Sequence, residues 1–116
     1  EIAQARSELA QRAKDGELSL AEMRDSTFTI SNLGMFGIDQ FSAILQPPEA
    51  AILAVGRIAD KAVVRDGQIV IRPMMTLTLS IDHRVLDGLI GSLFLQSLKD
   101  YIENPASFFN SIASSP

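Results

Sequence analysis

The chain of 116 residues has no cysteine, no tryptophan and a single histidine. The missing thiols exclude disulfides, thiolate catalysis, redox switching and zinc sites built from cysteine, and they leave the redox compartment undetermined. With one histidine and no dense cluster of carboxylates, we expect no metal site.

Long apolar runs and clusters of basic residues are also missing. No apolar stretch approaches the roughly 18 residues that a membrane span requires, so we expect no transmembrane helix. The formal net charge is -4, from 14 acidic and 10 basic residues scattered along the chain. Without a basic patch, neither nucleic acid nor an anionic membrane is an expected partner.

The composition is sufficient for one globular domain covering residues 1–116, because 47% of the residues are apolar and can build a core. The first residues predict a helix over about residues 2–15 rather than a signal peptide. Ser19 and Glu22 have the spacing of a capping box. This spacing predicts a second, short helix over about residues 20–25.

Five later segments have the composition or the period-two alternation of strands. They are residues 27–31, 50–55, 61–65, 68–71 and 75–81. Asp66-Gly67, between the third and the fourth, predicts a tight hairpin. An apolar stripe predicts a helix from Asp87 to about Glu103, ended by Asn104-Pro105. This order favours an α/β or α+β layered fold, with a mixed sheet and helices on one face.

His83 lies where the last predicted strand meets the last long helix, with an aspartate on either side. An imidazole can take and return a proton near neutral pH, so acid–base catalysis is one interpretation. The plain alternative is a turn residue whose ring bonds to a backbone carbonyl, while Arg84 and Asp87 form an ordinary ion pair. The residues alone leave both open.

Two blocks of the sequence resemble one known family. Residues 82–88 read Asp-His-Arg-Val-Leu-Asp-Gly. They are similar to the His-Arg-x-x-Asp-Gly signature of the dihydrolipoamide acyltransferases, the E2 cores of the 2-oxo acid dehydrogenase complexes. Residues 28–37, followed by residues 47–56, resemble the family's upstream block in order and spacing. The resemblance runs over nearly the whole chain, but it covers only the later, C-terminal half of that family's catalytic domain.

The resemblance implies roles for three residues. His83 matches the general base that takes a proton from the thiol of coenzyme A or dihydrolipoamide. Ser31 matches the hydroxyl that donates a hydrogen bond to the tetrahedral oxyanion. Asp87 matches an acidic or amide residue that helps to organise the histidine loop. No coenzyme A-binding residue is assigned.

The family's chloramphenicol acetyltransferase-like fold is implied as well, with the active site at a trimer interface. Ser31 and His83 would then meet only between neighbouring subunits. The resemblance implies transfer of an acyl group by direct thiol attack, without an acyl-enzyme. Residues 30–37 look most like the acetyl-transferring, pyruvate-type members.

The resemblance also implies substrates, partners and a location for this chain. Coenzyme A is a substrate, and the lipoyl group belongs to a domain outside the chain. Expected partners are that lipoyl domain, further copies of the chain in an oligomer built from trimers, and the E1 and E3 components of the complex. The expected location is intracellular, in a bacterial cytoplasm, a mitochondrial matrix or a plastid.

Two other classes of function stay open. Ser31, His83 and Asp87 could form a hydrolase triad, although Ser31 lacks the Gly-x-Ser-x-Gly elbow. The chain could also be a non-catalytic oligomeric scaffold, with Ser31 as a plain strand-end hydroxyl bonded to nearby backbone. The apolar tail residues fit either a domain's own core or a subunit interface. These are Phe108, Phe109 and Ile112.

Overall fold

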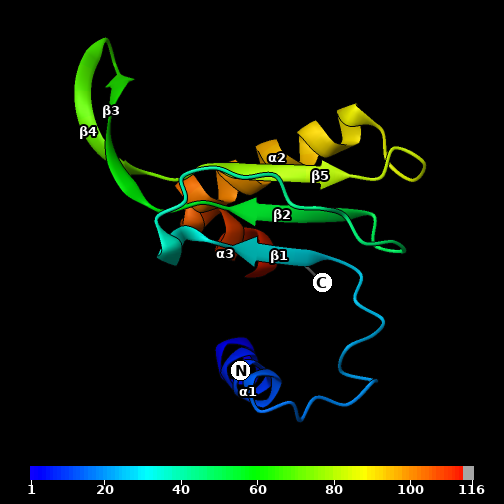
Figure 1. Cartoon of the computed structure of the whole chain (residues 1–116). Coiled ribbons are helices and arrows are strands. Elements are labelled where there is room, and N and C mark those ends of the chain that lie inside the picture. Colours follow the sequence, from blue (N-terminus) through cyan, green and yellow to red (C-terminus); the bar gives the residue numbers. More distant parts are fainter. Residues whose placement is uncertain (114–116) are drawn as a thin grey trace.

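The computed structural model describes residues 1–113 and contains two small sheets and three α-helices in that part of the chain (Figure 1). The elements in chain order are α1 (Ile2–Lys14), β1 (Thr29–Asn32), the 3-10 helix η1 (Gly34–Phe36), β2 (Ala51–Val55), β3 (Ala59–Arg65), β4 (Gln68–Met74), β5 (Leu77–Ile81), α2 (Gly88–Glu103) and α3 (Pro105–Ala113). Across residues 1–113, no helix combines the length and the apolar character that crossing a membrane requires.

The larger sheet is mixed and has the strand order β1-β2-β5. β1 runs parallel to β2, with Ser31 opposite Ala54. β2 runs antiparallel to β5, with Ala54 opposite Thr78. Residues 51–54 of the central strand are buried and form the core. A strand paired on both edges and covered on both faces has no solvated side, which explains its uninterrupted apolar run.

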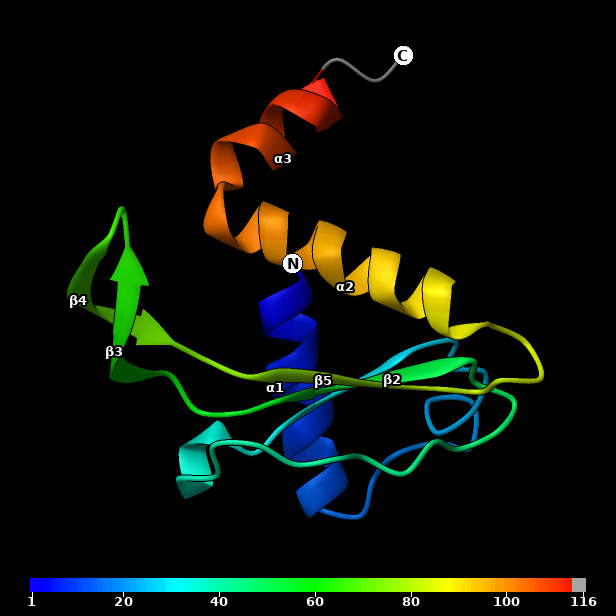
Figure 2. The same cartoon turned by 90° about the horizontal axis from the view of Figure 1, so that it is seen from above.

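The two faces of this sheet are covered differently, as Figure 2 shows: α2 lies over one face, and the irregular segment 38–46 runs along the other. Gly91 allows α2 to approach closely, because a Cβ there would lie 3.3 Å from a methyl of Ile81. On the other face, the Ser80 hydroxyl donates to the Ala43 carbonyl at 3.0 Å. The predicted mixed sheet with helices on one face is therefore confirmed.

The predicted hairpin is present and longer than expected. β3 and β4 pair along their whole lengths in a separate two-stranded sheet that projects from the body of the molecule (Figure 1). Asp66 and Gly67 have φ values of 53° and 74°. Positive φ at both central residues is what a type I′ turn requires, and this turn matches the twist of the flanking strands.

The short helix predicted over residues 20–25 is wrong, because residues 20–23 form only a turn. The capping box itself is present: the Ser19 N–H donates to the Glu22 carboxylate at 2.8 Å, and the Glu22 N–H donates to Ser19 Oγ at 3.2 Å. Asp25 then adopts a φ of 63°. A left-handed residue so soon after the cap leaves too few residues for the costly first turns of a helix.

The predicted end of the long helix at Asn104-Pro105 is confirmed, and a helix that was not predicted follows it. The chain does leave α2 at Asn104, but Pro105 then begins α3, where its fixed φ suits a first helical residue. Phe109 and Ile112 are 65% and 56% exposed, so covering the core of the described residues does not explain them. The side chain of Phe108, the third predicted tail residue, lies outside what is described.

Candidate active site

His83 lies in the turn between the end of β5 and the start of α2, as the sequence predicts. Its side chain is exposed. Among the residues described by the structure, no hydrogen bond to the imidazole is formed by a backbone carbonyl or any other group. The plain interpretation of His83 as a satisfied turn residue therefore has no support in the geometry.

Asp82 builds the turn around His83. Its backbone carbonyl accepts hydrogen bonds from Val85 and Leu86, both at 2.9 Å. Its carboxylate accepts the Arg84 backbone N–H at 3.0 Å and forms a two-pronged ion pair with the Arg84 guanidinium, at 3.0 Å from Nε and 2.8 Å from Nη2. The ion pair of Arg84 with Asp87, which belonged to the plain alternative, is not the one that forms, because the guanidinium contacts Asp82 instead.

Arg84 also sets the ionisation of Asp82. The guanidinium hydrogen bonds, followed by the backbone N–H of Arg84, lower the pKa of the Asp82 carboxyl from 3.8 to about 2. A depressed carboxyl pKa contributes stability above the unfolded value, and this contribution disappears as the pH falls through the folded value. Asp82 therefore stabilises the turn above about pH 4 and ceases to do so on acidification toward pH 2. The ion pair is fully charged at neutral pH.

Asp87 has a different task, because it is the N-cap of α2. Its carboxylate accepts the Ile90 backbone N–H at 2.8 Å, and its backbone is extended with φ -91° and ψ 168°. The N-cap role was predicted, and it is confirmed. Because Asp87 fixes the point where the helix begins, it also fixes the downstream end of the histidine loop.

Removing this cap tests how much Asp87 contributes to folding. We expect Asp87→Ala to lower the free energy of unfolding by about 1 kcal/mol, since it leaves an N–H of the first helical turn without its partner. Asp87→Asn retains an acceptor and is the matched control, with stability close to that of the parent protein. Denaturant unfolding of the full-length protein measures both variants. An equal loss in both would mean that the charge, not the cap, is what matters.

Ser31 is the third residue of β1 and is half-buried. Its hydroxyl makes no hydrogen bond with residues 1–113, so the alternative of a strand-end hydroxyl bonded to nearby backbone is not found. The hydroxyl remains available to an outside acceptor. The loop that follows is held in place by the Asn32 side chain, which accepts the Gly34 N–H at 2.8 Å.

Ser31 and His83 lie at opposite ends of the sheet. Ser31 aligns with Ala54 and, through it, with Thr78 near the start of β5, whereas His83 follows the end of that strand. Thr78 and Ile81 are separated by about 10 Å along the strand, and β1 is about 10 Å from β5 across the sheet. One chain therefore does not bring the two side chains together, and a triad of Ser31, His83 and Asp87 within one chain is excluded.

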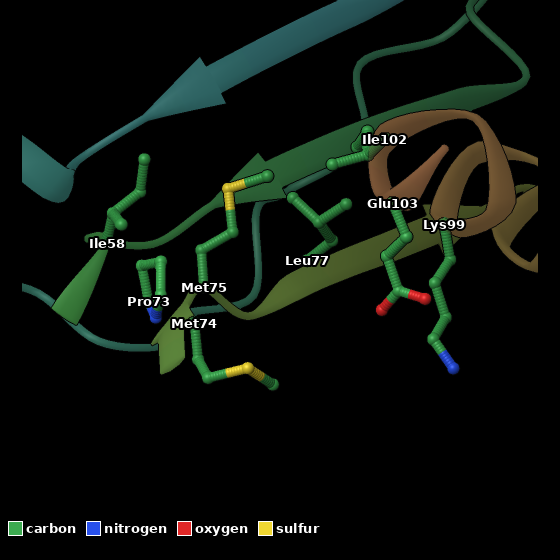
Figure 3. Close-up of a pocket in the computed structure, with 8 residues that line it drawn as sticks. All are labelled: Ile58, Pro73, Met74, Met75, Leu77, Lys99, Ile102 and Glu103. Carbon is green, nitrogen blue, oxygen red and sulfur yellow. The ribbon is translucent and has the colours of Figure 1, made fainter. Parts of the chain in front are cut away.

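A cavity of about 290 Å³ opens at the far end of β5 from His83, between the base of the hairpin and the end of α2. Figure 3 shows its apolar lining, which includes Ile58, Met75 and Leu77, and the charged side chains of Lys99 and Glu103 beside it. Neither Ser31 nor His83 lines this cavity. Its walls are mainly apolar, and its position removes it from the histidine turn.

A second cavity, of about 390 Å³, contains the buried carboxylate of Glu49. The hydroxyls of Ser26 and Thr29 each donate to Glu49 at 2.6 Å, and these bonds lower the pKa of its carboxyl. Glu49 thereby ties the start of β1 to the segment before β2. Within residues 1–113, no cluster of three or more histidine, aspartate or glutamate side chains has the arrangement of a metal site.

The cap at Asp87 was predicted from the sequence and is confirmed, whereas the catalytic roles of His83 and Ser31 stay predictions. The hydrogen bonds by which Asp82 closes the turn were not predicted. A signal was present, because aspartate side chains often accept the backbone N–H two residues later in an Asx turn. Asp82 accepts the Arg84 N–H in this way. Asp87 lies at a comparable spacing from Arg84, so the sequence does not show which of the two aspartates Arg84 contacts.

The sequence model of the 2-oxoacid dehydrogenases acyltransferase (catalytic domain) family matches residues 1–110. A dihydrolipoyllysine-residue acetyltransferase component of pyruvate dehydrogenase complex from Rickettsia felis is 46% identical over 91% of this chain and 26% of its own length. The mitochondrial counterpart from Dictyostelium discoideum is 48% identical over 84% of this chain and 16% of its own. The chain thus spans about a quarter or less of these relatives.

The solved structures that this chain resembles come from the same kind of protein. A probable dihydrolipoamide acetyltransferase from Listeria monocytogenes has a TM-score of 0.83 at 47% identity, covering 88% of this chain and 44% of its own. The dihydrolipoamide acetyltransferase of Azotobacter vinelandii has a TM-score of 0.87 at 36% identity, covering 93% and 44%. It was studied for the roles of a serine, a histidine and an asparagine in its catalytic mechanism. The cubic core of a pyruvate dehydrogenase multienzyme complex has a TM-score of 0.86 at 35% identity, covering 92% and 44%.

Proposed function

The chain belongs to the family of 2-oxoacid dehydrogenase acyltransferase catalytic domains, and we propose that the protein transfers an acetyl group between dihydrolipoamide and coenzyme A. We also propose that residues 1–116 are the C-terminal part of that catalytic domain; the chain covers 44% of each of these solved chains, which supports a partial domain. Curated relatives from Rickettsia and Dictyostelium are named acetyltransferases, which supports acetyl as the acyl group.

In the proposed reaction, neutral His83 is the general base. It takes the proton from the attacking thiol as sulfur bonds to the thioester carbonyl carbon, and it returns that proton to the departing thiolate. A thiol pKa lies only one to two units above neutrality, so an imidazole can deprotonate it at small cost. The exposed ring, free of hydrogen bonds to the described residues, supports this role.

Ser31 is the proposed donor to the oxyanion. When sulfur adds to the carbonyl carbon, negative charge develops on oxygen, and a fixed hydroxyl directed at that oxygen lowers the barrier. The Ser31 hydroxyl is not engaged by residues 1–113 and projects from a strand whose backbone is held by β2. Collapse of the intermediate restores the carbonyl and expels the other thiolate, so no bond to the enzyme forms.

The single observation that carries the assignment is a match in spacing. In the Azotobacter vinelandii enzyme, the serine and the histidine are 52 positions apart, and the asparagine follows the histidine by 4. Ser31, His83 and Asp87 have these same separations. Asp87 stands where that enzyme has an amide, and its cap geometry supports a role in holding the loop rather than in reacting.

The separation of Ser31 and His83 within one chain supports an active site shared between copies. We propose trimers as the unit, assembled further into a larger core, by analogy with the cubic core that this chain resembles. Proposed partners are a lipoyl domain and the E1 and E3 components of a pyruvate dehydrogenase complex. A bacterial cytoplasm or a mitochondrial matrix is the proposed location, since the named relatives are of both kinds.

An assay of acetyl transfer from acetyl-CoA to dihydrolipoamide by the full-length protein, run beside a mass measurement of the assembly, tests the proposal. We expect acetyl-dihydrolipoamide to form and the mass to be a multiple of three protomers. Release of coenzyme A without dihydrolipoamide would indicate a hydrolase instead. A stable assembly with no turnover on acetyl-, succinyl- or branched-chain acyl-CoA would favour a scaffold.

A further inference from the structure

The turn that carries His83 is closed by the polar groups of one residue on its upstream side. Asp82 donates its own N–H to the Ala50 carbonyl at 2.8 Å, which anchors the turn to the sheet. Its carbonyl accepts the N–H groups of Val85 and Leu86, and its carboxylate accepts the backbone N–H and the guanidinium of Arg84. The Asp82 side chain is only 11% exposed, whereas that of Arg84 is 77% exposed. The carboxylate of the pair is therefore largely enclosed by protein, whereas the guanidinium faces solvent.

We propose that Asp82, together with Arg84, is the positioning residue of His83: it holds the turn in the one shape that directs the imidazole toward the substrate thiol. This inference rests on the proposed function, because it concerns the same reaction. It assigns the two aspartates beside His83 to separate tasks. Asp82 sets the shape of the turn, and Asp87 sets the start of α2.

The need for such a residue follows from the surroundings of His83. A general base must lie within hydrogen-bond reach of its proton, and a displacement of about 1 Å can cost on the order of 100-fold in rate. The imidazole has no hydrogen bond within residues 1–113 to hold it. Its direction is consequently set by the backbone on either side, and Asp82 bonds to the N–H groups of residues 84, 85 and 86.

The Asp82–Arg84 pair is poorly suited to a role in stability alone. Ion pairs with an exposed partner contribute little to the free energy of unfolding, because water screens them and the side chains lose freedom. A two-pronged guanidinium contact instead restricts geometry, which is the property that such pairs supply best. We therefore expect its loss to be seen in turnover much more than in unfolding.

A double-mutant cycle in the full-length assembled protein tests the inference. The variants are Asp82→Ala, Asp82→Asn and Arg84→Ala, each made in the parent and in a His83→Ala background. Arg72→Ala is the matched control, because Arg72 is exposed on the hairpin and donates to the Ile71 carbonyl at 3.4 Å, away from the turn. The measured quantities are kcat, the KM for each substrate, the assembly mass and the unfolding midpoint.

We expect Asp82→Ala to lower kcat by about 100-fold and to leave both KM values and the assembly mass unchanged. The control Arg72→Ala should keep the kcat of the parent protein. Asp82→Asn, which keeps an acceptor for the Arg84 N–H, should lose less. In the His83→Ala background, the same changes should lower kcat no further, because a positioning residue has nothing left to position. Should Asp82→Ala fail to assemble, Asp82→Asn and Arg84→Ala carry the same comparison.

Unchanged kcat in the Asp82 and Arg84 variants would overturn the inference. So would an equal further loss when His83 is already absent, because that pattern indicates general damage to the fold. Full turnover in His83→Ala itself would overturn the proposed function, and the inference with it. The three results are distinguishable within one set of measurements.

Discussion

Replacing His83 by alanine should lower kcat for acetyl transfer by about 10²–10⁴-fold, the range that a positioned general base contributes. The remaining rate would come from binding and oxyanion stabilisation alone. Because the side chain is exposed and makes no hydrogen bond with residues 1–113, its removal should leave the assembly mass and the unfolding midpoint unchanged. Steady-state kinetics of the full-length protein, with mass measurement beside it, provides the comparison.

The matched variant for this prediction is His83→Gln, which keeps a polar group of similar reach but cannot act as a base near neutral pH. It should be as slow as His83→Ala. A rise in rate with pH above 8 in both variants would fit a thiol that ionises without help. Unchanged turnover in either variant would exclude His83 as the base and leave the scaffold interpretation as the stronger one.

Replacing Ser31 by alanine should lower kcat by about 10²–10³-fold with little change in KM, as expected when one oxyanion donor is lost. The interaction forms only when charge develops on the carbonyl oxygen, so substrate binding does not depend on it. Ser31→Thr retains a hydroxyl and should keep part of the activity. Kinetics of both variants in the full-length protein makes the measurement.

Ser80 offers a control for Ser31 in the same sheet. It is also half-buried, but its hydroxyl already donates to the Ala43 carbonyl. Ser80→Ala should cost about 1 kcal/mol of unfolding free energy and leave kcat near the parent value.

A fluorophosphonate probe that labels Ser31 covalently would contradict its role as a hydrogen-bond donor, since it would identify a nucleophilic serine.

The two variants together also test whether the active site is shared. Ser31 and His83 are separated by the length and the width of the sheet in one chain. Mixing Ser31→Ala protomers with His83→Ala protomers should therefore raise the activity above that of either variant alone, because some interfaces then receive an intact residue from each neighbour. No recovery in mixed assemblies, with exchange confirmed by mass, would indicate that both residues act within one subunit.

The features of this protein that depend on neighbouring residues could be predicted from the sequence. The Asp66-Gly67 turn needs two residues that accept positive φ, and that demand is local, so the hairpin could be predicted. The cap at Asp87 and the buried strand at residues 51–55 likewise follow from short-range chemistry and from an unbroken apolar run. The family signature in residues 82–88 and the upstream block in residues 28–37 also made His83 and Ser31 candidates, and their roles stay predictions.

Other features depend on which of two partners a side chain contacts, or on which strands pair, and these could not be predicted from the sequence. Arg84 had two aspartates within reach, and the path of the turn selected Asp82. The capping box at Ser19 and Glu22 formed without its helix, because Glu22 also pairs with Arg12 of α1 and the chain then turns at Asp25. The separation of Ser31 from His83 depends on strand order and register, which are set by which strands pair. Sequence patterns carry local preferences, whereas pairing across the sheet is settled by packing of the whole chain.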